Sequence, residues 1–274
     1  MPRESVTGDP GSRRALLEAL RQDPARTAIL TDVDGTLAPI AERPEQAAVP
    51  EGARDALAAL GKRFGLIACI SGRPALQARR LVGVKEIAYA GNHGLELLLP
   101  GEREPRLDPS LKEREADAAA FAAGLDLREL EDTGLRLEDK GPIQALHWRA
   151  AKEERVAEAR AHEIAAEGGR AGLEPRWGRK VLELRPAGGG GKDTAVAALL
   201  ADGGIVRAAY AGDDRTDLDA YRRLRELCEE GQLELAVCIG VLSSEAPPEL
   251  PEEADLIVDG PAGWLEILDC LMES

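Results

Sequence analysis

Cysteines and aromatic residues are few in this sequence of 274 residues. It contains four cysteines, three tryptophans, three tyrosines and two phenylalanines. The cysteines are far apart and form no CxxC pair, which argues against a zinc site or a disulfide framework and favours reduced thiols. Because aromatic residues make up only 3% of the chain, aliphatic side chains must supply most of any hydrophobic core.

Long apolar runs and excess positive charge are also lacking. No uninterrupted apolar stretch approaches the ~18 residues of a membrane-spanning helix, and the first residues are charged, unlike the apolar core of a signal peptide. Lysine and arginine number 35 against 50 aspartates and glutamates, which gives a formal charge of −15. Since nucleic acids and anionic membranes attract basic surfaces, we expect a cytoplasmic protein that binds neither of them.

Short apolar segments alternate with helical patterns in the first and last parts of the chain. In the first part we predict strands at 28–31, 65–70 and 86–90, with helices at 51–64 and 75–81. In the last part we predict helices at 193–201, 217–230 and 264–271, with strands at 206–211, 234–241 and 255–258. This alternation is typical of an α/β fold with a Rossmann-like, doubly wound parallel sheet. Ligands of such sheets bind beyond the carboxyl ends of the strands.

The alternation is interrupted between residues 104 and 186. The patterns there predict helices at 111–124 and 151–168, and strands at 135–139, 143–149, 173–176 and 180–185. The order αββαββ indicates an α+β domain inserted into the parallel-sheet core. We therefore expect a first core segment at 1–104, an inserted domain at 105–186 and a second core segment at 187–274.

Two aspartates, Asp32 and Asp34, follow directly after the first predicted strand and precede Gly35. Side chains two residues apart on an extended segment point the same way, and two carboxylates that close repel each other unless a cation joins them. The pair indicates a Mg²⁺ site in which Asp32 accepts a phosphoryl group and Asp34 acts as acid and base. The alternatives are a solvated turn or an EF-hand calcium loop, but residues 37–40 offer no side-chain ligands.

A serine and a lysine can supply phosphate contacts. Ser71 and Gly72 follow the second predicted strand, where a hydroxyl and backbone N–H groups can bind a phosphate oxygen, although such a pair can also be a simple turn. Lys192 follows a glycine run that superficially resembles a Walker A loop. Because Pro186 replaces the leading glycine of that motif, we predict instead that Lys192 reaches Asp32 and the phosphate.

A second acidic cluster follows the strand predicted at 206–211. Asp213 fits a further metal ligand, whereas Asp214 and Asp217 fit positions behind it that orient the ligands and Lys192. An acid-rich helix N-terminus, stabilised by the helix dipole, would have the same composition. The occurrence of this cluster together with the first aspartate pair favours the metal site.

Taken in order, the motifs DVDGT (32–36), SGR (71–73), Lys192 and GDDRTD (212–217) resemble the haloacid dehalogenase (HAD) superfamily of Mg²⁺-dependent phosphotransferases. An insertion between the second motif and the lysine resembles the type IIB cap of that superfamily. Within it, the chain is similar to the trehalose-6-phosphate phosphatases, also at GNHG (91–94), EDKG (138–141), HWR (147–149) and ELRP (183–186). The resemblance thus covers nearly the whole chain and includes the inserted domain.

The resemblance implies a role for each matched residue. The metal ion would be Mg²⁺, held by Asp32, the backbone carbonyl of Asp34 and Asp213, and the phosphate would be bound by Ser71, Gly72 and Lys192. The sugar hydroxyls would be bound by cap residues, namely Glu138, Lys140 and Glu183, with His147 and Arg149 approaching the substrate.

The activity implied by the resemblance is a step of trehalose biosynthesis. A monomeric phosphatase would hydrolyse trehalose 6-phosphate to trehalose and phosphate through an aspartyl-phosphate. One alternative is the same chemistry on sucrose phosphate, on glucosyl- or mannosyl-3-phosphoglycerate, or on a pseudo-disaccharide phosphate. Another is a non-catalytic regulator on the same core, although Asp32, Asp34, Lys192 and Asp213 are all present. His93 either lies near the sugar or satisfies a carbonyl at a strand end.

Overall fold

The chain forms two compact units. The computed structural model describes residues 10–41, 46–107, 116–178, 180–188, 190–201, 204–243 and 246–273. One unit comprises Met1–Arg106 and Gly190–Ser274, and the other comprises Leu107–Gly189. The second unit is therefore an insertion in the first, and its junctions lie near the boundaries expected after residues 104 and 186. None of the helices formed by the described residues combines the length and hydrophobicity needed to cross a bilayer.

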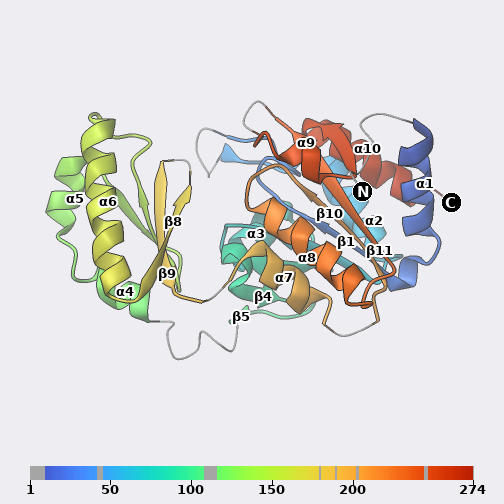
Figure 1. Cartoon of the computed structure of the whole chain (residues 1–274), viewed down its shortest axis with the longest axis horizontal. Helices are drawn as coiled ribbons and strands as arrows, with labels where there is room; N and C mark the ends of the chain where they lie inside the picture. Colours follow the sequence, from blue (N-terminus) through green and yellow to red (C-terminus); the bar gives the residue numbers. More distant parts are fainter. Residues whose placement is uncertain are drawn as a thin grey trace. The chain divides into compact units, whose positions relative to one another are not determined.

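A mainly parallel sheet forms the centre of the first unit (Figure 1). Its described strands lie in the order β12-β11-β10-β1-β2-β3-β4-β5. They are β1 (Thr27–Thr31), β2 (Leu66–Ile70), β3 (Ala88–Gly91), β4 (Glu96–Leu98), β5 (Arg106–Leu107), β10 (Arg207–Gly212), β11 (Leu235–Leu242) and β12 (Leu256–Asp259). Neighbouring strands from β12 to β3 are parallel, whereas β4 pairs antiparallel with β3.

Helices pack on both faces of this sheet. One face carries α1 (Pro10–Arg21), α2 (Glu51–Leu60), α3 (Ala75–Val82) and α10 (Gly260–Met272), and the other carries α7 (Lys192–Leu199), α8 (Asp217–Glu229) and α9 (Leu250–Glu253). Successive residues of β1 alternate between these layers, with Ile29 in one core and Leu30 in the other. All five residues of β1 are buried for this reason. The predicted doubly wound α/β core is confirmed.

The carboxyl ends of the central strands lie at one edge of the sheet. Thr31, the last residue of β1, is level with Ala211 on β10 and with Cys69 on β2. The backbone N–H of Asp32 continues the ladder and donates to the carbonyl of Ala211 at 2.8 Å. The residues that follow β1, β2 and β10 therefore meet where parallel sheets bind their ligands.

The second unit is an antiparallel sheet covered by helices on one face. Its strands β6 (Arg136–Asp139), β7 (Gln144–His147), β9 (Val181–Pro186) and β8 (Leu173–Gly178) lie in that order. Among the described residues, α4 (Asp117–Ala122), α5 (Leu127–Thr133) and α6 (Glu154–Arg170) cover them. Leu146, Leu182 and Leu184 face these helices. Since side chains alternate along a strand, Ala145 and Glu183, which pair with each other, belong to the opposite face.

The strands are predicted well from the sequence, and the helix ends less well. Every predicted strand is present with its ends shifted by at most two residues, and the order αββαββ is confirmed with one added helix. The helix predicted at 51–64 ends at Leu60, that at 151–168 starts at Glu154, and that at 264–271 starts at Gly260. The helix predicted at 111–124 lies partly outside the described residues.

The added helix, α5, was missed because its sequence is short and has no clear apolar period. It is seven residues long and is fixed mainly by its ends. The side chain of Asp126 accepts hydrogen bonds from the first backbone N–H groups, and Gly134 ends the helix with a φ of 82°.

Candidate active site

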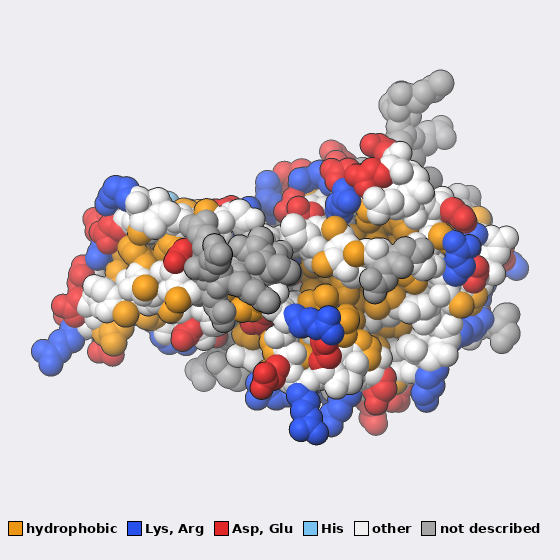
Figure 2. Space-filling model, turned by 90° about the horizontal axis from the view of Figure 1, so that it is seen from below, with side chains coloured by type: hydrophobic (Ala, Val, Ile, Leu, Met, Phe, Trp, Pro, Cys, Tyr) orange, Lys and Arg blue, Asp and Glu red, His pale blue; other side chains and the backbone are white. Residues whose placement is uncertain are grey.

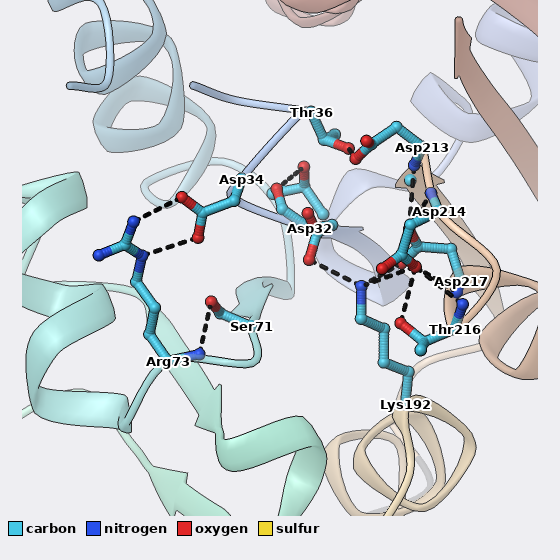
Figure 3. Close-up of polar contacts among 12 residues, drawn as sticks. Asp32, Asp34, Thr36, Ser71, Arg73, Lys192, Asp213, Asp214, Thr216 and Asp217 are labelled. Carbon is cyan, nitrogen blue, oxygen red and sulfur yellow. Dashed lines mark hydrogen bonds and ion pairs between the residues drawn. The ribbon is translucent and has the colours of Figure 1, made fainter. Parts of the chain in front are cut away.

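Lys192, at the start of α7, is buried among carboxylates at the edge of the core sheet (Figure 3). Its Nζ lies 2.7 Å from Oδ1 of Asp32 and 2.5 Å from Oδ1 of Asp217. Burial by itself lowers the pKa of Lys192, but the carboxylates of Asp214, Asp217 and Asp32 outweigh this effect and raise the pKa well above its usual value. The lysine is therefore a fixed positive charge in contact with Asp32.

Asp32 is held at its backbone and by Lys192 at one of its two side-chain oxygens. Its backbone carbonyl accepts a hydrogen bond from Oγ1 of Thr31 at 2.8 Å, and Thr31 in turn accepts one from the indole of Trp264 at 3.1 Å. Nζ of Lys192 contacts Oδ1 of Asp32. In the described part of the chain no hydrogen-bond donor contacts the other carboxylate oxygen, Oδ2. Burial raises the pKa of Asp32 well above its ordinary range, with Lys192 opposing the shift.

Asp217, the first residue of α8, ties this region together through both of its carboxylate oxygens. Oδ1 accepts from Lys192 and, at 2.6 Å, from the hydroxyl of Tyr210, whereas Oδ2 accepts from the backbone N–H groups of Asp213 and Asp214, both at 2.9 Å. Burial raises the pKa of Asp217 to about 7. With four donors, Asp217 shapes the loop that follows β10.

Asp213, on that loop, is placed against the loop that follows β1. Its Oδ1 accepts a hydrogen bond of 2.7 Å from the hydroxyl of Thr36. Gly35 has a φ of 99°, and a Cβ built on it would lie closer than 3.0 Å to the carboxyl carbon and both oxygens of Asp213. Burial raises the pKa of Asp213 to about 6. The missing side chain at Gly35 therefore makes the space that the Asp213 carboxylate fills.

The acidic cluster fits a divalent cation. Asp32, Asp213 and Asp217 each offer one oxygen, and these oxygens lie within 4.8 Å of one another. Each oxygen of Asp217 already accepts two hydrogen bonds, so Asp217 is better suited to orient the site than to bind the ion. Asp32 and Asp213 are buried carboxylates with raised pKa values, which a hard cation such as Mg²⁺ would stabilise in their charged form. The donor set fits Mg²⁺, with the carbonyl of Asp34 as a further predicted ligand.

Ser71 and Gly72 form a tight loop after β2. The Oγ of Ser71 accepts from the backbone N–H of Arg73 at 3.1 Å, which leaves the hydroxyl hydrogen able to reach a phosphate oxygen. A Cβ on Gly72 would lie closer than 3.0 Å to the ring of His93. His93 therefore packs against this loop.

Asp34 points away from the carboxylates of Asp32 and Asp213 and toward Arg73 (Figure 3). Nε and Nη2 of Arg73 each donate to a different oxygen of Asp34 at 2.7 Å. This bidentate pair joins the loops after β1 and β2.

The face of the second unit opposite its helices carries linked charges. Nζ of Lys140 lies 2.9 Å from Oε1 of Glu183, and Nη2 of Arg185 lies 3.3 Å from Oε2 of the same glutamate. On the same face, Nε2 of His147 lies 2.8 Å from Oε2 of Glu138, which is level with Ala145 and Glu183 across the sheet. The hydrogen bond from His147 is the main cause that lowers the pKa of Glu138. Both glutamates are therefore held as oriented, ionised acceptors.

Comparison with known proteins identifies the family. The sequence matches the family model described as trehalose-phosphatase over residues 30–246, which is most of the chain. The chain belongs to the trehalose-phosphatase family. This confirms the family indicated by the motifs at Asp32, Ser71, Lys192 and Asp213.

Individual members of the trehalose-phosphatase family are similar to the chain at moderate identity. A probable trehalose-phosphate phosphatase of Sinorhizobium fredii is 33% identical over 242 residues, which cover 86% of each chain. A probable trehalose-phosphate phosphatase of Oryza sativa is 32% identical over 225 residues, 73% of this chain and 60% of that protein. The chain spans about three-fifths of the length of the plant relatives that it matches.

A solved structure has the same fold as this chain. The C-terminal domain of the trehalose-6-phosphate phosphatase of C. albicans superposes with a TM-score of 0.73, at 22% identity. The match covers 95% of this chain and 96% of the other. The similarity therefore extends over both units.

The structure brings most of the predicted core residues together. Asp32, Lys192, Asp213 and Asp217 converge, and Asp214 lies 3.7 Å from Lys192. In the second unit, Glu138 is joined to His147 and Lys140 to Glu183. Arg149 is different, because the strand predicted at 143–149 ends at His147 and leaves Arg149 exposed in the following turn.

Sequence reasoning missed several polar partners of these residues. They include Thr36, which binds Asp213, Tyr210, which binds Asp217, and Arg73, which binds Asp34. Thr36 and Arg73 lie within the motifs at 32–36 and 71–73, and their place in these motifs was the sequence signal that could have identified them. Tyr210 gave no signal, since a tyrosine in a buried strand normally indicates only core packing.

Proposed function

We propose that this protein is a Mg²⁺-dependent phosphatase that hydrolyses trehalose 6-phosphate to trehalose and inorganic phosphate. The observation that carries the proposal is the convergence of Asp32, Lys192 and Asp213 at the carboxyl edge of the core sheet. Membership of the trehalose-phosphatase family supports the chemistry and the choice of sugar. The activity belongs to trehalose biosynthesis.

Asp32 is the proposed nucleophile. Its free oxygen attacks phosphorus in line with the departing sugar oxygen and forms an aspartyl-phosphate. Lys192 and the hydroxyl of Ser71, with the backbone N–H of Gly72, bind the phosphoryl oxygens. Mg²⁺, held by Asp32, the carbonyl of Asp34 and Asp213, would supply positive charge that balances the phosphoryl group.

Asp34 is the proposed acid and base. It donates a proton to the O6 atom of the sugar as the P–O bond breaks. It then accepts a proton from the water molecule that hydrolyses the aspartyl-phosphate. Asp214 and Asp217 act indirectly, because they orient Lys192 and the loop that carries Asp213.

Residues of the second unit are the proposed sugar contacts. Glu138 and Glu183 are ionised and oriented by their basic neighbours, so they can accept hydrogen bonds from sugar hydroxyls. Lys140 and His147 can donate to hydroxyl or phosphate oxygens. Arg149, exposed in the turn after β7, is the least constrained member of this set.

We expect a monomer in the cytoplasm, with no nucleic acid or membrane partner. The formal charge is −15, and on the face seen in Figure 2 acidic and basic side chains are interspersed. A phosphate ester would therefore be bound by a few local cations such as Lys192 rather than by a broad basic surface.

The substrate is tested by phosphate release from a panel of phosphate esters with Mg²⁺. The panel contains trehalose 6-phosphate, sucrose phosphate, glucosyl- and mannosyl-3-phosphoglycerate and a pseudo-disaccharide phosphate. We expect the highest kcat/KM for trehalose 6-phosphate. Asp32→Asn is the control, which should fold normally, with an unchanged circular dichroism spectrum, and release no phosphate above background.

Two results would change the proposal. A preference for a phosphoglycerate would assign another sugar phosphate to the same chemistry. Binding of Mg²⁺ without hydrolysis of any phosphate ester would indicate a non-catalytic regulator.

A further inference from the structure

Glu183 contacts two cations on the sheet face of the second unit that lies opposite the helices. Its Oε1 lies 2.9 Å from Nζ of Lys140, and its Oε2 lies 3.3 Å from Nη2 of Arg185. The side chain of Glu183 is 8% exposed, that of Arg185 is 6% exposed and that of Lys140 is 13% exposed. One cation would balance the charge of this buried carboxylate, so the second cation is not required for neutrality.

Arg185 is the more firmly placed of the two cations. It lies two residues after Glu183 on β9, so both side chains belong to the same face of the sheet. β9 is an inner strand between β7 and β8, and Arg185 is level with Glu174 on β8. Burial lowers the pKa of Arg185, and the carboxylate of Glu183 opposes this shift. Since an arginine in a protein stays protonated, Arg185 is a permanent charge beside Glu183.

Lys140 has a different setting. It follows the last residue of β6 and precedes Gly141, which has a φ of 81°, in the turn that leads to β7. Its ammonium group is carried by a flexible four-carbon chain, whereas the guanidinium of Arg185 is a rigid plane. Lys140 can therefore turn from Glu183 to a hydroxyl or phosphate oxygen of a ligand. Oε1 of Glu183 then becomes available to accept a hydrogen bond from a sugar hydroxyl.

We propose that Arg185 is a positioning residue for sugar binding that acts through Glu183. The inference rests on the proposed function. Arg185 keeps Glu183 ionised and holds its Oε2 in place while Lys140 exchanges Glu183 for the substrate. If Arg185 were absent, this exchange would leave a buried carboxylate without either of these two cations, which is strongly unfavourable. Arg185 thereby lowers the free-energy cost of moving Lys140 to the sugar phosphate.

Arg185 itself is poorly placed to contact a sugar. Only 6% of its side chain is exposed, and its Nη2 group donates to Glu183. Its effect on the substrate therefore passes through Glu183, and hydrolysis of a substrate without a sugar should not depend on it.

The test compares two substrates of the full-length protein. One is the sugar phosphate that the wild-type protein hydrolyses best, and the other is p-nitrophenyl phosphate, which offers the phosphoryl group without a sugar. Both are assayed with Mg²⁺, and kcat and KM are determined separately. A residue that orients an acceptor for the sugar changes KM for the sugar phosphate and leaves the chemistry at phosphorus intact.

We expect Arg185→Met to lower kcat/KM for the sugar phosphate by about 10- to 100-fold, mainly through a higher KM, since this is the range for a hydrogen bond to a charged group. With p-nitrophenyl phosphate the change should stay below about 3-fold. Arg185→Lys should lower kcat/KM for the sugar phosphate by only about 3- to 10-fold, because lysine keeps the charge but not the planar group. In a Glu183→Gln background, Arg185→Met should have no further effect on the sugar phosphate, because a neutral amide needs no cation.

The matched control is Arg160→Met. Arg160 also belongs to the second unit, is 16% exposed and pairs with Glu129 at 2.8 Å and with Glu167 at 3.2 Å, but it lies on α6. Arg160→Met should lower the melting temperature, as Arg185→Met does, while kcat/KM for both substrates stays at the wild-type value. The control therefore separates a loss of stability from a loss of sugar binding.

Equal losses with both substrates would overturn the inference, because Arg185 would then act on the fold or on the catalytic residues. Unchanged kcat/KM with both substrates would overturn it as well, and so would a further loss from Arg185→Met in the Glu183→Gln background. If Arg185→Met does not fold, Arg185→Lys decides the question by the same comparison of substrates. Failure of the proposed function is recognised separately in the wild-type protein, which would then hydrolyse no sugar phosphate of the panel.

Discussion

Replacing Gly35 by alanine tests whether the loop after β1 creates the space for Asp213, the proposed metal ligand. The backbone at Gly35 has a φ of 99°, and a Cβ at this position would overlap the Asp213 carboxylate. The backbone on both sides of Gly35 belongs to the loop that continues β1. The side chain of Asp213, rather than this backbone, must therefore move to relieve the overlap. Its hydrogen bond to Thr36 would then be lost.

The size of the effect can be estimated from two contributions. A positive φ costs an alanine roughly 1–2 kcal/mol relative to glycine. The hydrogen bond between Thr36 and a charged Asp213 is worth about 1.5–3 kcal/mol. We therefore expect Gly35→Ala to lower the free energy of unfolding by about 3 kcal/mol, and the melting temperature by about 6–12 °C. The affinity for Mg²⁺ should fall at least ~100-fold, because one carboxylate ligand is displaced.

Gly231→Ala is the matched control. Gly231 also has a positive φ, of 74°, but nothing lies within 4 Å of a Cβ built there. Gly231→Ala should lower the free energy of unfolding only by the cost of the positive φ, and its Mg²⁺ affinity and turnover should be unchanged. Melting temperature is measured by calorimetry with EDTA present, and Mg²⁺ affinity by titration calorimetry. If Gly35→Ala bound Mg²⁺ as tightly as Gly231→Ala does, the explanation of the glycine would be wrong.

Two further predictions follow from the buried charges. Lys192→Met leaves Asp32 and Asp217 without their cation, and urea unfolding at about pH 7.5 should show a free energy of unfolding lower by roughly 3–5 kcal/mol. The decrease should be smaller at about pH 6, because Asp217, whose pKa is raised, takes up a proton there. An equal decrease at both pH values would contradict this prediction. The pKa of Asp213 is raised to about 6 from about 3.9 in the unfolded chain, so stability without metal should fall as pH rises through this window. Because Mg²⁺ needs the carboxylate form, it should raise the melting temperature more at about pH 7.5 than at about pH 5 in a thermal shift assay. A stabilisation by Mg²⁺ that did not depend on pH would count against Asp213 as a ligand.

Much of the core site was predictable because each motif combines a local pattern with a general rule. An apolar run that ends in Asp32 indicates a buried strand with an acid at its carboxyl end, and the same holds for Ser71 and Asp213. The rule that carboxyl ends of parallel strands share one edge then brings these residues together. The convergence of Lys192 on Asp32, 160 residues earlier, is the strongest confirmed prediction of geometry.

The specific hydrogen bonds could not be predicted in this way. The direction of the Asp34 side chain, toward Arg73 and away from Asp213, depends on side-chain rotation and on the exact path of two loops. Arg149 was placed in a strand because the apolar pattern continues to Trp148, but the backbone leaves the sheet after His147. Patterns of apolar residues report burial, and they do not report where a strand stops pairing.

The sequence alone determined the order of the parallel strands along the chain, the inserted unit and the identity of the acids, because apolar periodicity and strand-end motifs depend on neighbouring residues only. The tertiary structure decided which oxygen of each acid is occupied, which glycine makes room for Asp213, and which arginine holds Asp34. The contacts of Asp34 and Asp213 join residues 39 to 178 positions apart, and their distances and angles exist only once the chain is packed.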